Sequence, residues 1–264
     1  VLPQNWLYQS SYQNYRRSLL KDRRIRHLSQ LGANAFDVSV GADVLLLILS
    51  EGGEFFNGQD LTDCKNSEGK SESLMSSNLT ILNSKVAINH GDARISLQER
   101  NLELPTLESY TACSAGILNG DTPRFVALHW EVTSSYYPAW SFFQRTTDHS
   151  KHFGGMSNII LWEGGSGQLR KLAVELKERL HDADRRGNQA WGKRGIAISQ
   201  MGKLPASTYV GDLYDQSVAM IIPKSDKYLP AISAYCESTY YSDEVRKIDK
   251  NLKVTVSTLL KVPF

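Results

Sequence analysis

Residues 1–20 read VLPQNWLYQSSYQNYRRSLL, and this stretch decides how the first part of the chain folds. Val1–Leu7 is predicted to be a short strand or the end of one. Ser10 or Ser11 is the predicted N-cap of a helix, because a hydroxyl there can accept a hydrogen bond from the first turn. The helix itself is indicated by residues that recur at the i, i+3, i+7 spacing of one face, namely Tyr12, Tyr15 and Leu19.

Two apolar stretches follow the helix and are predicted to be strands. Ile25–Leu31 is short and biased toward apolar residues. Val44–Ser50 is a continuous apolar run, as found in strands that are covered on both faces. The sequence GANA at residues 32–35 reads as a turn between them. The order strand, helix, strand, turn, strand predicts the end of an α/β sheet.

The composition changes from Glu51 to Ser77, where Gly, Ser, Asn, Asp, Glu and Lys dominate. Such a polar stretch predicts a linker or exposed loop and a domain boundary. We therefore expect residues 1–52 to be the end of the α/β sheet, residues 53–78 to be a linker or exposed loop, and residues 79–264 to form a second domain. An ordered insertion is the alternative for the middle segment.

The second domain is predicted to be α+β, because strand and helix patterns are mixed without regular alternation. The clearest helix is Gln168–Arg186, and two more are expected between Tyr228 and Asp249, the second capped by Ser242. The predicted strands are Lys85–Asn89, Phe125–Val132, Asn158–Trp162, Gly195–Ser199, Val218–Ile222 and Leu252–Val256. The whole chain is thus expected to be α/β followed by α+β.

The composition is that of a globular protein with one large or two smaller domains. The chain has 264 residues, of which 41% are hydrophobic and 22% charged. Its longest apolar run, Val44–Leu49, is far below the about 20 residues that span a bilayer, so no membrane partner is expected. Three scattered cysteines without a CxxC pair argue against a disulfide framework or structural zinc, and for a reducing cytosol.

The net charge is only +2, but basic residues gather in two places. Local basic faces on a nearly neutral protein suit a polyanion that touches part of the surface. A solvated helix face is the simpler interpretation of either cluster alone. The first cluster comprises Arg16, Arg17, Lys21, Arg23, Arg24 and Arg26, and the second comprises Arg185, Arg186, Lys193, Arg194 and Lys203.

Three short motifs are weak candidates for chemistry. Gly164–Gly167 (GGSG) precedes a predicted helix but lacks the Lys-Ser/Thr of a phosphate-binding loop, so a plain turn is favoured. His149 and His152 are the two ends of the sequence HSKH. No third metal ligand is obvious, so a polar loop is the favoured interpretation. Glu175 and Lys177 match half of a magnesium-dependent nuclease site, but that site needs a strand and these residues are predicted mid-helix.

The stretch WGKRGIAISQMGK, residues 191–203, is a more specific candidate. A short apolar strand carries basic residues and Gln at its ends, with glycines that allow close approach. Gln and Arg can read adenine and guanine in the major groove, and Lys suits phosphate contacts. An edge strand with charges that discourage pairing explains the same pattern equally well.

The opening stretch also resembles a known family. LPQNWLYQSSYQNYRRSLL, then LGANAF and VLLLIL, is similar to a stretch of adenine-specific DNA methyltransferases, the large fused enzymes of type IIG restriction-modification and of the BREX and DISARM phage-defence systems. There it follows the catalytic tetrapeptide and completes the class I (Rossmann-like) methyltransferase sheet. The matching residues are Pro3, Asn5, Trp6, Tyr12, Arg16, Leu20, Gly32 and Phe36.

Two later segments resemble the same enzymes, in the same order. Gly120-Asp121, Arg124-Phe125 and Trp130-Glu131 look like the GD-x-x-RF segment that opens their recognition half. ISQMGKLPASTYVGD, VAMIIPKSDKYLPAISAYCES and the terminal TLLKVPF are similar to their target-recognition region. The resemblance implies a shaping role for Gly120, Asp121, Arg124 and Phe125, for which a buried pair of Asp121 and Arg124 is one way. It implies a packing or ion-pair role for Arg16 and leaves Arg17 as an ordinary surface charge.

The resemblance implies a target-recognition portion that binds duplex DNA for a catalytic part elsewhere in a prokaryotic cytoplasmic enzyme. The sequence has no Pro-Pro pair and no glycine-rich strand–turn for S-adenosylmethionine, so no catalytic or cofactor residue is assigned and the cofactor belongs to the parent enzyme. A nuclease at Glu175 and Lys177, or a protein-interaction module of a defence complex, remain alternatives. The expected DNA contacts are Lys193, Arg194, Gln200 and Lys203, with Arg145, Lys151 and His152 as a second set.

Overall fold

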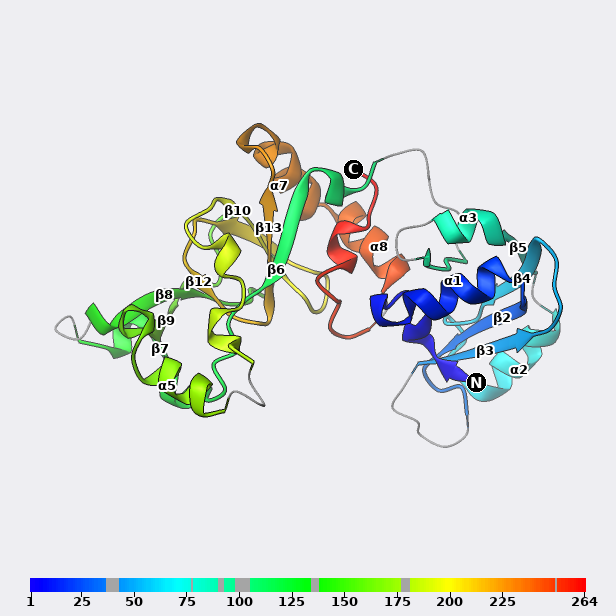
Figure 1. The fold of residues 1–264 in the computed structure, drawn as a ribbon, viewed down its shortest axis with the longest axis horizontal. Coiled ribbons are helices and arrows are strands. Elements are labelled where there is room, and N and C mark those ends of the chain that lie inside the picture. The colour runs from blue at the N-terminus through cyan, green and yellow to red at the C-terminus, as the bar shows by residue number, and fades with distance from the viewer. Residues whose placement is uncertain are drawn as a thin grey trace. The chain divides into compact units, whose positions relative to one another are not determined.

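The computed structural model describes residues 1–36, 43–76, 78–89, 93–97, 105–133, 138–176, 181–249 and 251–264. The chain divides into two compact units (Figure 1). Unit 1 comprises Val1–Asn101 with Lys247–Asp249, and unit 2 comprises Leu102–Arg246 with Lys250–Phe264. The fold is mixed α/β with three sheets, as expected at the level of class.

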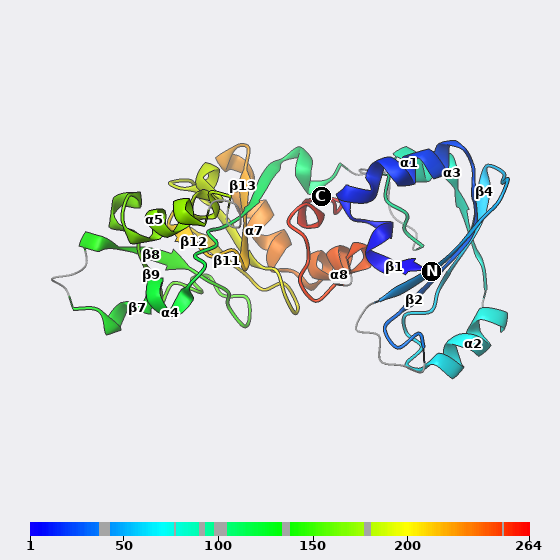
Figure 2. The ribbon, with the colours of Figure 1, turned by 60° about the horizontal axis from the view of Figure 1, so that its bottom comes forward.

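Unit 1 is built on one five-stranded sheet in the order β1-β3-β2-β4-β5. The β2–β4 pair is parallel and the other pairs are antiparallel. Figure 2 shows α1 and α3 on one side of this sheet and α2 on the other. The elements are β1 (Leu2–Pro3), α1 (Gln13–Lys21), β2 (Ile25–Gly32), β3 (Val44–Leu49), β4 (Phe55–Asp60), α2 (Ser67–Ser76), β5 (Thr80–Asn83) and α3 (Ser84–Asn89), with 3₁₀ turns at Gln4–Leu7 and Ser10–Tyr12.

The strand–helix–strand–strand order expected for the opening is confirmed, with changes at its start. The predicted strand over residues 1–7 is only two residues long before a 3₁₀ turn begins. Helix α1 starts at Gln13 and has no side-chain cap, so the predicted serine cap is wrong. Strand β3 is buried at Val44 and Leu45 but exposed at Ile48 and Leu49, so it is not covered on both faces along its length.

The predicted linker over residues 53–78 is wrong, because β4 and α2 lie within it. Strand β4 pairs with β2 on one side and β5 on the other, so it is an interior strand. The boundary between the compact units falls near Asn101 instead. Composition misleads here because α2 packs through few apolar residues and through Lys70, a side chain that is ordinarily exposed but is buried in this fold.

Residues 85–89, predicted to be a strand, form part of helix α3. The side-chain oxygen of Asn83 accepts hydrogen bonds from the backbone N–H groups of Lys85 and Val86. An Asn that satisfies these free donors favours a helix start over continuation of the strand.

Unit 2 contains two four-stranded sheets, in the orders β11-β10-β13-β6 and β12-β8-β9-β7. The first is antiparallel throughout, and the second has one parallel pair, β12–β8. The strands are β6 (Thr111–Ala115), β7 (Val126–Leu128), β8 (Trp140–Gln144), β9 (Asn158–Leu161), β10 (Gly195–Ser199), β11 (Ala206–Tyr209), β12 (Leu213–Tyr214) and β13 (Val218–Pro223). The helices are α4 (Thr122–Phe125), α5 (Gln168–Glu175), α7 (Leu229–Glu237) and α8 (Thr239–Ile248).

Short 3₁₀ turns connect many of these elements. They lie at Leu107–Ser109, His129–Glu131, Glu163–Gly165, Ala183–Arg185, Asn188–Ala190, Asp226–Tyr228 and Thr258–Leu260. Two buried clusters form the core. One gathers Ile117, Phe125, Phe143, Ile160, Leu169 and Leu213, and the other Ala190, Ala197, Tyr209, Tyr214, Val218 and Met220. Trp191 packs against both clusters and so joins the two sheets.

Several predictions for this unit are confirmed, namely strands β9, β10 and β13 and the two helices after Tyr228. Other predicted elements differ from the structure in their bounds or are absent. Helix α5 ends at Glu175 rather than Arg186, and Lys177 and Leu180 lie outside the described residues. The only strand in the stretch 125–132 is the three-residue β7. Residues 252–256 are not a strand. Helix α8 begins at Thr239, and the hydroxyl that accepts from its first turn belongs to Ser238 rather than Ser242.

Among the described residues, none of the helices combines the length and the apolar character that crossing a bilayer requires.

Candidate nucleic-acid interface

Strand β10, the centre of the candidate stretch 191–203, is buried along its whole length. It lies between β11 and β13, so it is an interior strand and not the charged edge strand of the simpler interpretation. The strand itself therefore cannot enter a DNA groove. What reaches the surface are its two ends, with Lys193 and Arg194 before it and Lys203 after it, and all three of these side chains are exposed.

Gln200 does not reach the surface, which corrects its predicted role in base contact. Its residue exposure is 2%, and its Nε2 donates to the carbonyl oxygen of Val254 at 2.8 Å. Its backbone N–H donates to the carbonyl of Ser217, and its carbonyl accepts from the N–H of Val254. Gln200 thus anchors the β10–β11 turn to the segment near the C-terminus.

The loop between β8 and β9, residues 145–157, lies along β11. The N–H of Lys151 donates to the carbonyl of Ala206 at 3.1 Å, and Lys151 and Ser207 form a parallel bridge. Ser150 Oγ accepts from the N–H of Ala206 at 3.1 Å. Farther along, the N–H of Thr208 donates to the carbonyl of His152 at 3.0 Å. These bonds bring Lys151 and His152, predicted as a separate second set, beside the hairpin that carries Lys203.

A third segment, residues 251–254, meets the same turn. Arg246 of α8 donates from Nη2 to the carbonyl of Gly202 at 2.8 Å and from Nη1 to the carbonyl of Asn251. The ammonium of Lys253 donates to the carbonyl of Gln216 at 3.1 Å. We call the exposed parts of these three segments, residues 146–153, 201–203 and 251–253, the three-loop surface.

The three-loop surface combines cations with exposed apolar groups. Lys151, His152 and Lys203 are exposed, and within the described part of the chain neither lysine has an ion-pair partner. Asp148 is the exposed acidic residue of the same loops. The exposed large apolar side chains are Phe153, Met201 and Leu252. Unpaired ammonium groups on hydrogen-bonded loops can contact phosphate without a further ordering of the loop backbone.

Arg145, the remaining member of the second set, lies at the base of its loop. Its Nε is 4.0 Å from Oδ2 of Asp215, whose carboxylate is largely buried. The other oxygen of Asp215 accepts from the N–H and the hydroxyl of Ser217. The charge of Arg145 is therefore partly compensated inside the protein by Asp215. Arg145 is thus a weaker candidate for a phosphate contact than Lys151.

Lys193 and Arg194 stand apart from the three-loop surface, at the opposite end of β10. Arg194 and Gln200 are six residue steps apart along extended chain, which corresponds to roughly 20 Å at about 3.3 Å per step. This exceeds the about 12 Å width of the DNA major groove. The two groups therefore cannot share one phosphate, but they could contact separate phosphates of one duplex.

The GD-x-x-RF segment shapes the fold, though not through a buried Asp–Arg pair. Asp121 caps α4 by accepting from the N–H of Arg124 at 3.3 Å, and Gly120 has a positive φ of 73° that favours glycine. Phe125 is fully buried in the core. Arg124 is exposed and donates to Oε1 of Gln168 at 2.9 Å. The prediction of a buried pair was thus wrong, because the carboxylate serves as a helix cap.

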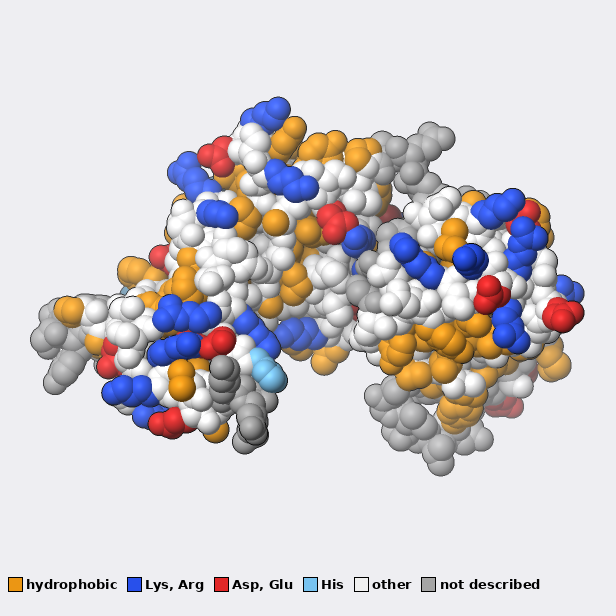
Figure 3. Space-filling model, viewed as in Figure 1, with side chains coloured by type: hydrophobic (Ala, Val, Ile, Leu, Met, Phe, Trp, Pro, Cys, Tyr) orange, Lys and Arg blue, Asp and Glu red, His pale blue; other side chains and the backbone are white. Residues whose placement is uncertain are grey.

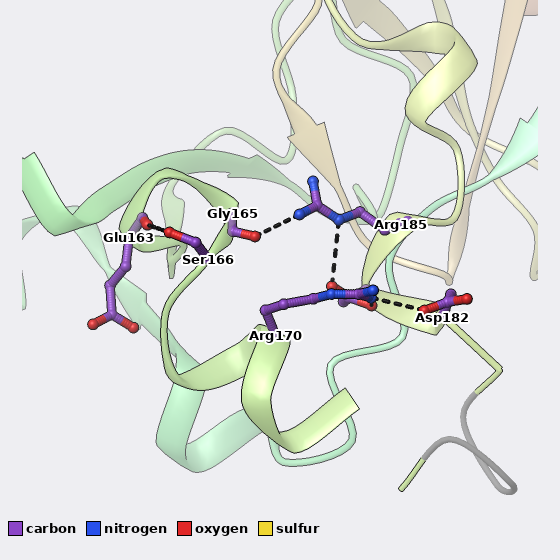
Figure 4. A network of polar contacts seen from close by, with 7 residues as sticks. Glu163, Gly165, Ser166, Arg170, Asp182 and Arg185 are labelled. Carbon is purple, nitrogen blue, oxygen red and sulfur yellow. Dashed lines mark hydrogen bonds and ion pairs between the residues drawn. The ribbon is translucent and has the colours of Figure 1, made fainter. Parts of the chain in front are cut away.

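The glycine-rich turn before α5 does not offer a phosphate site. The carboxylate of Glu163 accepts from the N–H of Gln168 at 2.6 Å, where a phosphate would bind. Figure 4 shows the surrounding polar network, in which Arg185 donates to the carbonyl of Gly165 and Arg170 pairs with Asp182. Hydrogen bonding to Asp182, assisted by the charge of Asp184, raises the pKa of Arg170. No sequence pattern indicates this network, because its residues are of types that are ordinary on a protein surface.

The other two motifs also remain without a metal site. Within the ranges that the structure describes, no three His, Cys, Asp or Glu residues gather as metal ligands would. His149 and His152 lie in the exposed loop, as the polar-loop interpretation predicted. Glu175 is the exposed last residue of α5.

No protein-family model matches the chain. No curated protein matches it. Among solved structures, it is similar to the type IIG restriction endonuclease BpuSI, with a TM-score of 0.39 and 11% sequence identity over 99% of this chain. The chain spans 39% of the length of that enzyme.

Proposed function

We propose that this chain binds duplex DNA as the target-recognition portion of an S-adenosylmethionine-dependent adenine-specific DNA methyltransferase in restriction-modification or phage defence. The supporting observation is the three-loop surface, where Lys151, His152 and Lys203 come together from distant parts of the sequence. The proposal places the end of the catalytic fold in unit 1 and DNA recognition in unit 2. The catalytic loop and the cofactor site lie in a part of the enzyme outside these residues.

The physical role of such a surface follows from the cost of exposing the target base. Extruding one adenine from a duplex costs a few kcal/mol of unstacking, which protein contacts elsewhere must offset. Each lysine that neutralises a phosphate releases counterions and so favours binding. Two cationic groups, one at each end of β10, would hold the duplex at separate points and fix its orientation.

The test is a salt titration of duplex binding by the double variant Lys151→Ala/Lys203→Ala. The slope of log K against log salt should become shallower by about 1.8, because two phosphate contacts are lost at about 0.9 each. The variant Lys193→Ala/Arg194→Ala should reduce it similarly. The control, Lys65→Ala/Lys227→Ala, removes two other exposed lysines and should keep a steeper slope than either.

If the slope of log K against log salt is unchanged in both test variants, the proposed residues do not contact phosphate. A chain with no affinity for duplex DNA even at low salt would instead support the protein-interaction module. Magnesium-dependent cleavage of DNA that is abolished in Glu175→Ala would support the nuclease alternative.

A further inference from the structure

A hollow lies between helices α1 and α3 of unit 1. The two helices lie side by side in both ribbon views (Figures 1 and 2). The hollow has a volume of about 530 Å³. Its lining comes from both helices and comprises Arg17, Ser18, Lys21, Ile88 and Asn89. It includes two members of the first basic cluster, to which the proposed function gives no role.

Hydrogen bonds fix the two helices that form the hollow. Arg16, the neighbour of Arg17, is fully buried, and its Nε donates to the carbonyl of Ala93 at 3.1 Å. This bond ties α1 to the segment that follows α3. At the other end of α3, the side-chain oxygen of Asn83 accepts from the N–H of Lys85 at 2.8 Å. The hollow is therefore a fixed part of the fold of unit 1.

The cations of the hollow are not compensated by acidic side chains. Arg17 and Lys21 are exposed, and within the described part of the chain neither has an ion-pair partner. No acidic residue is among the described residues that line the hollow. The nearest acid along the chain, Asp22, accepts a hydrogen bond from the hydroxyl of Ser18 at 3.3 Å. Figure 3 shows Lys and Arg side chains over the region of α1 and α3.

The spacing of these cations is unfavourable without a partner. Arg17 and Lys21 are four residues apart on α1, and like charges at this spacing repel each other. The helix dipole favours Lys21, which lies in the last turn, but not Arg17, which lies one turn earlier. On α3, by contrast, Lys85 pairs with Glu54 at 3.1 Å. A solvated face accounts for single charges, whereas two uncompensated cations around one hollow favour an anion site.

We propose that this hollow binds a phosphate group. The guanidinium of Arg17 can hold two phosphate oxygens with parallel N–H donors, and the ammonium of Lys21 adds a second positive charge. The side-chain amide of Asn89 supplies a further donor from α3. A carboxylate has only two oxygens for these three donor groups, whereas a phosphate group offers at least three.

The hollow is larger than a phosphate group alone requires. Its volume lies within the range of about 300–1,000 Å³ that is usual for small-molecule sites, and half-buried Ile88 adds an apolar wall. The phosphate group therefore belongs to a larger molecule, which is either a small-molecule monoester or the backbone of a nucleic acid. A monoester needs nothing from the proposed function, whereas a DNA backbone would extend that function to unit 1.

The experiment titrates the full chain with inorganic phosphate at constant ionic strength and follows the side-chain amide signal of Asn89 by NMR. We expect a saturable shift of this signal. Arg17→Gln/Lys21→Gln should weaken phosphate binding at least about ten-fold, because charge-assisted hydrogen bonds are lost. The control, Arg24→Gln/Arg26→Gln, removes two exposed cations of the same cluster outside the hollow. It should change the affinity by less than about two-fold, because salt screens distant charges.

A salt titration of duplex binding distinguishes the two sources of the phosphate group. If a DNA backbone occupies the hollow, the slope of log K against log salt becomes shallower by about 1.8 in Arg17→Gln/Lys21→Gln, since two phosphate contacts are lost. If a small-molecule monoester occupies the hollow, the affinity for inorganic phosphate falls in this variant while the slope for duplex DNA stays unchanged.

The absence of a saturable shift in the parent chain would overturn the proposal. An equal loss of phosphate affinity in both double variants would also overturn it, because the effect would then be one of net charge. The phosphate titration contains no DNA. Failure of duplex binding therefore leaves the phosphate site standing, and failure of the phosphate site leaves the three-loop surface standing.

Discussion

Two long basic side chains of unit 1 are buried and bind backbone carbonyls. Arg16 is fully buried, and its guanidinium donates to the carbonyls of Trp6, Gln9 and Ala93 at 2.5–3.1 Å. Its neighbour Arg17 is exposed. The family resemblance implied packing or an ion pair for Arg16 and left Arg17 as a surface charge. The structure confirms the packing role, since the planar guanidinium can satisfy several acceptors at once.

Lys70 likewise donates hydrogen bonds to buried backbone carbonyls, on the other side of the sheet. Its replacement therefore gives a stability prediction. Its ammonium donates to the carbonyls of Leu31, Leu61 and Cys64 at 2.7, 3.3 and 2.5 Å. Lys70→Met keeps the volume but removes all three donors. We expect it to lower the free energy of unfolding by about 2–4 kcal/mol, because buried acceptors lose their partners.

Lys65→Met is the matched control for this prediction, because Lys65 is exposed on the same segment. It should change the free energy of unfolding by less than about 0.5 kcal/mol. Urea unfolding followed by circular dichroism measures both variants. Equal stability of Lys70→Met and the parent chain would show that the three carbonyls do not depend on the ammonium.

At the scale of elements, strong hydrophobic patterns predicted strands well. Residues 195–199 form β10 as expected, and β2, β3 and β13 agree with their predictions within one residue. Strands β3, β10 and β13 are apolar enough that burial decides their structure, whereas β2, with the sequence IRHLSQLG, mixes apolar and polar residues. Composition failed at β4, whose sequence FFNGQD has few of the apolar residues typical of an interior strand. Its place between β2 and β5 comes from pairing partners that a local window does not contain.

The candidate site was predictable in part. Exposed lysines next to a buried strand were found from sequence, as were Lys151 and His152 in their loop. That these two sets adjoin could not be predicted, because the contacts join residues about 50 positions apart, such as Lys151 and Ser207. Gln200 was misjudged for the same reason. Its partner Val254 lies 54 residues away, so nothing local distinguishes it from an exposed Gln.

The contact between α5 and the 3₁₀ turn at 183–185 rests on one buried carboxylate. Asp184 has no exposed side-chain area, and its oxygens lie 2.9 Å from Arg170 Nη1 and 3.6 Å from Arg185 Nε. Asp184→Ala leaves both guanidinium groups without this partner. We expect a loss of about 1–3 kcal/mol in the free energy of unfolding, because a buried acceptor is lost while both guanidinium groups remain partly exposed to water and Arg170 keeps Asp182.

Asp182→Ala tests the same helix contact from the outside. The Asp182 side chain is half exposed, although it also pairs with Arg170 at 2.8 Å. Its removal should lower stability by no more than about 1 kcal/mol. Chemical denaturation of the two variants decides the matter. Similar losses in both would mean that burial of Asp184 adds nothing to the pair.

At the scale of the whole molecule, unit 2 is closed by contacts between its two ends. The N–H of Leu107 donates to the carbonyl of Val262, and that of Phe264 to the carbonyl of Pro105, both at 2.9 Å. The ring of Phe264 packs edge-on against Tyr110 and Tyr235. Residues about 155 positions apart thus complete one fold, so loosening the interior of unit 2 should affect it as a whole.

The interior of unit 2 holds phenols and thiols that must stay protonated, which makes its stability sensitive to alkali. Burial raises the pKa of Tyr214 to about 12, and the pKa of the thiol of Cys113, a residue that is partly exposed, is also raised. Burial also raises the pKa values of Tyr209, Cys236 and Tyr241. In the unfolded chain these groups lose protons near pH 8.5 to 10. Between these values and the folded pKa, the native state holds more protons, so stability falls as pH rises.

We therefore expect the thermal midpoint of unit 2 to be constant up to about pH 8 and to fall steeply between about pH 9 and 11, since each such group contributes up to about 1.4 kcal/mol per pH unit. Hydrogen exchange in β6 and β13 locates the transition. Tyr214→Phe removes one of these groups, at the loss of a 2.7 Å hydrogen bond with Ser114. It should lower the midpoint at pH 8 yet flatten its decline above pH 10. A thermal midpoint that stays level to pH 11 in the parent chain would contradict the idea that the interior must stay protonated. An unchanged decline of the midpoint with pH in Tyr214→Phe would show that Tyr214 is not one of the groups responsible.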